Sequence, residues 1–141
     1  MASSERAHIL AVVAEKAKDA AALDPSLVIE EAASVEEAAA RLRRQPRPEL
    51  IVVGSAVNAG LAGDHLLEAD GETSLLFMIR PDRLARFQAG LPFMPRLHRA
   101  WTAADDVAPS DLRQIMLDAV ASARGRGWGR TDKVDVSVVN S

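Results

Sequence analysis

Few side chains in this sequence are of the kinds that carry out chemistry, and they form no compact motif. The chain has no cysteine, which excludes disulfides, thiolate catalysis and cysteine-ligated metal sites. Its three histidines, His8, His65 and His98, are widely spaced. Asp64, His65 and Glu68 share one expected helix and form a weak metal pattern, for which a solvated helix face is the favoured interpretation. No metal site or nucleophile elbow is therefore expected.

A loop rich in small residues, from Gly54 to Gly63, is the second chemical candidate. Its first part, Gly54 to Gly60, has a composition that would let backbone amides approach a phosphate group. The loop is not a P-loop, because no Gly-Lys-Ser or Gly-Lys-Thr sequence follows it. We therefore favour a plain connection between a strand and a helix and keep a nucleotide site as the alternative.

Composition limits the class of protein. The chain has 141 residues, of which 48% are hydrophobic and 26% are charged, as in one soluble globular domain. The net charge of −3 is the opposite of what a dedicated nucleic-acid-binding protein requires. The N-terminus lacks a signal-peptide pattern, and no apolar run approaches the ~20 residues of a membrane span. The expectation is a cytoplasmic protein, with no cofactor, no nucleic acid and no membrane among its partners. Fourteen of the seventeen basic residues are arginine, as is common in GC-rich bacterial genomes.

The hydrophobic pattern predicts that strands and helices alternate along the chain. Strands are expected at 7–13, 27–30, 50–53, 74–79 and 98–102. Helices are expected at 15–23, 35–44, 61–68, 81–89 and 108–123. The clearest local signal is the pair Ser34 and Glu37, which forms a capping box at the start of the second helix.

This alternation implies an α/β fold. Parallel strands joined by right-handed crossovers place helices on both faces of one sheet. With five strands the expected fold is a flavodoxin-like (βα)5 three-layer sandwich with strand order 2-1-3-4-5. Residues 1–123 are expected to form the domain, and 124–141 to form a linker and a strand-like tail, with Val134 to Val139 as its strand-like part.

From about Ala7 to Ala123 the chain resembles the receiver domain of bacterial response regulators. The resemblance lies in the order and spacing of four pieces: the first strand, the lead into the second helix, the third strand and the start of the last helix. In this sequence these pieces are Ala7–Val13, Glu31–Ala38, Pro48–Val53 and Ala108–Leu112. The resemblance implies an aspartate acceptor after the third strand, acidic magnesium ligands after the first, a hydroxyl after the fourth and a lysine after the fifth.

This sequence departs from the receiver pattern at each of those four positions. Gly54 takes the acceptor position, and Glu15 is all that remains of the acidic pair. The fourth strand ends at Ile79-Arg80, and no lysine lies between Lys18 and Lys133. The resemblance therefore implies a degenerate receiver, or pseudo-receiver, that is not an enzyme. Such a domain acts in signalling or scaffolding through protein–protein contacts without phosphoryl transfer.

A second resemblance supplies the alternative function. Leu50 to Gly63, with Ser74 to Pro81, is similar to the nucleotide-binding end of universal stress proteins. That family has an aspartate at the end of its first strand, and none stands there in this chain. The alternative is a small nucleotide-binding protein of the universal-stress type.

Large apolar side chains and arginines gather between the fourth helix and the last strand. We interpret them in two ways, as core beneath the fourth helix or as a face that binds a protein partner or a second copy. The fourth helix, fifth strand and fifth helix would form that homodimer face. Its candidate residues are Phe93, Met94, Arg96, Leu97, Arg99 and Trp101.

Overall fold

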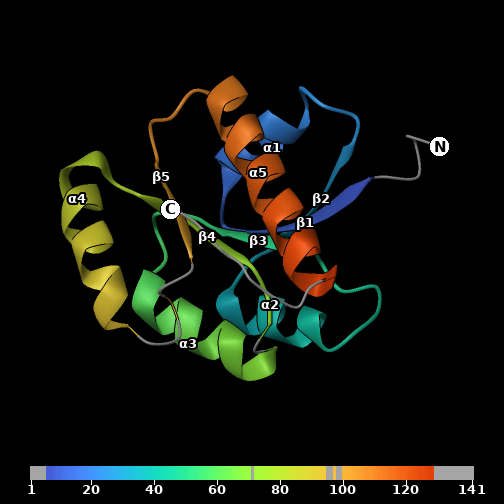
Figure 1. The fold of residues 1–141 in the computed structure, drawn as a ribbon, viewed down its shortest axis with the longest axis horizontal. Coiled ribbons are helices and arrows are strands. Elements are labelled where there is room, and N and C mark those ends of the chain that lie inside the picture. The colour runs from blue at the N-terminus through green and yellow to red at the C-terminus, as the bar shows by residue number, and fades with distance from the viewer. Residues whose placement is uncertain (1–5, 71, 95–96, 98–99, 129–141) are drawn as a thin grey trace.

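A computed structural model describes residues 6–70, 72–94, 97 and 100–128 (Figure 1). Its strands are β1 (Ala7–Val12), β2 (Leu27–Ala32), β3 (Leu50–Val53), β4 (Leu75–Ile79) and β5 (Trp101–Ala104). Its helices are α1 (Glu15–Ala21), α2 (Val35–Leu42), α3 (Ala59–Ala69), α4 (Pro81–Gly90), the short 3₁₀ helix η2 (Leu91–Phe93) and α5 (Pro109–Trp128). Among the described residues no helix is both long and apolar enough to cross a membrane.

The strands form one parallel sheet in the order β2-β1-β3-β4-β5. This confirms the predicted α/β flavodoxin-like sandwich. Side chains alternate between the two faces of each strand, so each face of the sheet has its own core. One core lies under α1 and α5, and the other lies under α2 and α3. Phe87 of α4 packs edge-on against Phe77 of β4 in the second core, with ring centroids 5.6 Å apart.

The capping box at the start of α2 is confirmed. The backbone N–H of Glu37 donates to Ser34 Oγ at 3.1 Å. The Glu37 carboxylate accepts from the N–H of Ala33, one residue before the cap. Both contacts satisfy amide groups near the helix start, where no intrahelical partner is available.

Some predicted boundaries are wrong. The last strand starts three residues later than predicted, at Trp101. A linker is predicted from Arg124, but α5 continues through this glycine-containing stretch as far as Trp128. The strand-like piece Val134 to Val139 lies outside the described residues.

Candidate functional site

The carboxyl ends of the parallel strands form the edge at which open α/β sheets bind their ligands. In this chain that edge is built from the residues that follow the strands: Val13 after β1, Ala33 after β2, Gly54 after β3, Arg80 after β4 and Asp105 after β5. Gly54 follows β3 directly, so it lies at the position that the receiver resemblance assigns to the phosphoryl acceptor.

The backbone around Gly54 leaves no room for a side chain. The Gly54 N–H donates to the carbonyl oxygen of Val12 at 2.9 Å, which holds this residue close to the end of β1. A Cβ atom on Gly54 would lie 1.8 Å from the carbonyl oxygen of Val13 and 2.7 Å from its carbonyl carbon. Since the obstacle is backbone, it cannot move aside as a flexible side chain would. The acceptor carboxylate is therefore absent, and the space for it is closed as well.

Val13 closes this space with an unusual conformation. Its φ is 51°, in the left-handed region that β-branched residues rarely adopt. Its N–H donates to the carbonyl oxygen of Ala32 at 3.3 Å. The side chain is exposed, so burial does not compensate for the strain of about 1–3 kcal/mol that such a conformation costs.

The other receiver groups are replaced too. Glu15 is the first residue of α1 and is exposed, and no group of three potential metal ligands occurs among the described residues. Arg80, at the end of β4, forms an exposed ion pair with Asp82 at 3.2 Å. The described metal candidates Asp64, His65 and Glu68 are all exposed on α3 and do not form such a group. His98 lies outside the described residues.

Lys16, at the start of α1, brings an amino group to the carboxyl ends of the strands. Its Nζ donates to the carbonyl oxygen of Val107 at 3.2 Å, which ties the start of α1 to the connection between β5 and α5. Receivers place their lysine after the fifth strand, so reasoning from sequence position overlooks Lys16. Its only signal in the sequence is its place next to Glu15 at the start of a helix.

The residues of the predicted interaction face do not share one surface. Phe93 is 85% exposed, and Met94 is partly buried against the α2–α3 core. Leu97 is buried in that core, so it adds nothing to an exposed face, which corrects the prediction for this residue. Trp101 is partly buried against the core under α1 and α5, on the opposite side of the sheet. Arg96 and Arg99 lie outside the described residues.

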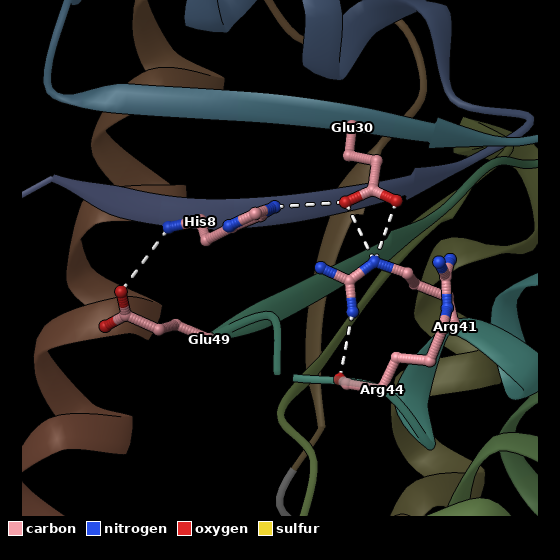
Figure 2. A network of polar contacts seen from close by, with 5 residues as sticks. All are labelled: His8, Glu30, Arg41, Arg44 and Glu49. Atoms are coloured by element: carbon pink, nitrogen blue, oxygen red, sulfur yellow. Dashed lines mark hydrogen bonds and ion pairs between the residues drawn. The ribbon is translucent and has the colours of Figure 1, made fainter. Parts of the chain in front are cut away.

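A second group of polar residues forms a network that joins β2, the start of β1 and α2 (Figure 2). Arg41 of α2 is buried, and its Nε contacts both carboxylate oxygens of Glu30 at 2.8 and 3.0 Å. The Arg41 guanidinium also donates to the carbonyl oxygen of Arg44 at 3.1 Å. His8 Nε2 lies 3.1 Å from Glu30 Oε1. The Arg41 guanidinium, followed by His8, holds the pKa of Glu30 below its ordinary value of 4.5 despite partial burial.

Because the pKa of Glu30 is lowered, this network should make stability depend on pH. The unfolded chain binds more protons than the folded one as pH falls from about 5 through the folded pKa of Glu30. The contribution of Glu30 to the unfolding free energy is thus complete at neutral pH and lost in acid. In urea titrations between pH 7 and pH 3, Glu30→Gln should lose less stability than wild type.

Glu68→Gln is the matched control, because Glu68 is exposed on α3. It should follow the wild-type pH dependence. Equal pH dependence of wild type and Glu30→Gln would show that the Arg41–Glu30 contact does not contribute to folding stability.

No family model and no curated protein matches this chain. Several solved structures share its fold, among them the following two. NtrX from Brucella abortus in complex with ADP, a response regulator, matches with a TM-score of 0.67 and 13% identity over 86% of this chain and 29% of that chain. A fusion that carries a trimeric coiled-coil segment of yeast Spc42 matches with a TM-score of 0.64 and 14% identity over 86% of this chain and 79% of that chain. This is a receiver-like fold. At such low identity the likeness concerns the fold alone.

Proposed function

We propose that this receiver-like domain acts in signalling or scaffolding through protein–protein contacts and without phosphoryl transfer. The observation that carries the proposal is the closed acceptor position: a Cβ on Gly54 would lie 1.8 Å from the Val13 carbonyl oxygen. A receiver works by charge at this site, since metal and lysine stabilise the transferred phosphoryl group. A glycine without space for a side chain supplies neither an acceptor nor a cavity, so the fold is left with its surface as its means of action.

The first test is chemical. Incubation with Mg²⁺ and acetyl phosphate should leave the protein mass unchanged, and beryllofluoride should leave the amide NMR spectrum unchanged. A stable phosphoryl adduct within residues 50–60 would contradict the proposal. Titration with ATP in a calorimeter should give no binding heat, and a saturable heat would favour the nucleotide-binding alternative instead.

We place the partner-binding surface on α4, η2 and α5. The structure describes every residue of α4, and none of them is buried. Arg83 and Arg86 are exposed on this helix. Phe93 of η2 exposes a large apolar ring, and Asp111 and Asp118 are exposed on α5. Exposed arginines on α4, exposed aspartates on α5 and the exposed ring of Phe93 suit a second copy of the chain, because a two-fold axis would bring opposite charges together.

Phe93→Ser should weaken self-association about tenfold, since a central aromatic residue commonly dominates the affinity of an interface. Sedimentation at micromolar concentration measures the change in dissociation constant. The control is Leu23→Ser, an exposed apolar residue on the α1–β2 connection, which should sediment like wild type. A wild-type monomer over this concentration range, or equal effects of both variants, would remove this face as a homodimer surface.

A further inference from the structure

The C-terminal end of α5 is helical where its own residues disfavour a helix. From Arg124 to Trp128 the sequence alternates glycine with larger residues, yet α5 continues to Trp128. Each glycine in a helix interior disfavours the helix relative to alanine. A Cβ on Gly125 would meet no atom within 4 Å, so packing does not require glycine at this position. Something other than local preference holds this end of the helix.

The contact that holds the end of α5 is made by Arg124, the residue before the first glycine. The Arg124 guanidinium donates to both carboxylate oxygens of Glu49, at 2.5 and 3.0 Å, and to the carbonyl oxygen of Arg6 at 3.2 Å. Arg124 thereby joins α5 to the residues that precede β3 and β1. The two side chains are 35% and 28% exposed, so solvent and other charged groups can reach the pair.

Glu49 itself is fixed to the sheet. Its N–H donates to the carbonyl oxygen of His8 at 2.8 Å, and its carboxylate accepts from the His8 N–H at 3.4 Å (Figure 2). The carboxylate therefore has a defined position before Arg124 binds it, which reduces the entropy lost on pairing.

We propose that Glu49 is a latch for the end of α5. While its carboxylate holds Arg124, the glycine-containing turn from Gly125 to Trp128 stays helical. When another charged group binds Glu49 or Arg124, the turn unwinds. The stretch contains two glycines, Gly125 and Gly127, so the partly exposed ion pair opposes a helix-breaking tendency of at least comparable size, and the helical state is easily lost. The latch does not rest on the proposed function, because its contacts involve none of Phe93, Asp111 and Asp118.

Cα chemical shifts of residues 125–128 test the latch, because they report helix directly. Glu49→Gln keeps the size of the side chain and removes its charge. It should lower the helical population of these four residues about threefold to fivefold, with unchanged shifts from Ile115 to Val120. Gly125→Ala in the Glu49→Gln background should restore much of the helix, since Gly125 has open space around it.

Glu72→Gln, an exposed carboxylate at the same edge of the sheet, is the control and should leave the shifts of residues 125–128 at wild-type values. The proposal is overturned if these shifts are already those of a random coil in wild type. It is equally overturned if Glu49→Gln keeps them helical, or if it shifts the whole of α5 rather than its end.

Discussion

Replacing Gly54 with aspartate should destabilise the protein by several kcal/mol and should not create a phosphorylation site. The new Cβ would meet the Val13 carbonyl at 1.8 Å, so the ends of β1 and β3 would have to separate. Both strands lie inside the sheet, and all their residues except His8 are buried, so such a shift disturbs both cores at once. Gly54→Ala tests the steric cause alone and should cost about 2–5 kcal/mol. Urea denaturation followed by circular dichroism measures both variants.

Gly60→Ala is the matched control for these substitutions. Gly60 lies in the first turn of α3, and its nearest neighbour to a Cβ would be Asn58 Oδ1 at an ordinary 3.6 Å. This variant should be as stable as wild type or more so, because alanine favours the helix. A Gly54→Ala protein with wild-type stability would show that Val13 does not close the acceptor position. A Gly54→Asp protein that reacts with acetyl phosphate would contradict the closed acceptor position on which the proposed function rests.

Val52→Asp should prevent folding. Val52 lies in the middle of β3 with no exposed surface, in the core between the sheet and α1 and α5. An aspartate there would bury a charge without a partner. The cost would be several kcal/mol, comparable with the whole stability of a small domain, which is about 5–15 kcal/mol. The variant should be insoluble or should lack native circular dichroism.

The control for Val52→Asp is Val28→Asp, which places the same substitution on the edge strand β2. Val28 is exposed, so its carboxylate would stay hydrated and should change the unfolding free energy by less than about 1 kcal/mol. A soluble Val52→Asp protein with native circular dichroism would mean that β3 is not the central, doubly covered strand that the structure describes.

The fold follows from patterns that are local in the sequence. The continuous apolar run Leu50–Val53 predicts a strand covered on both faces, and all four of its residues are buried. Ser34 with Glu37 predicts the start of α2, and the cap contact is present. With strands and helices in strict alternation, the right-handed crossover restricts the topology to very few arrangements. The order 2-1-3-4-5 could therefore be predicted without coordinates.

For the candidate site, the sequence predicts only which receiver side chains are missing. The sequence shows that Gly54 lacks a carboxylate and that the fifth strand lacks a following lysine. It does not show that Val13 blocks Gly54 or that Lys16 reaches Val107, because these residues are 41 and 91 positions apart. The sequence also does not show which apolar residues before β5 are buried: Leu97 joins the core while Phe93 remains exposed. Contacts of this kind depend on how loops from different strands meet, and no periodicity encodes that.

The sequence by itself thus determined the class of fold, the strand order and which residue types stand where the receiver resemblance expects its acceptor and lysine, because hydrophobic period, capping and residue type are local properties. Tertiary structure alone decided three things: that the acceptor position is closed, that Leu97 is core, and that α5 continues past Arg124. In each case a partner distant in sequence overrides the local preference. The Val13 carbonyl closes the space at Gly54, the α2–α3 core takes in Leu97, and Glu49 holds Arg124 at the start of a stretch whose glycines favour a coil.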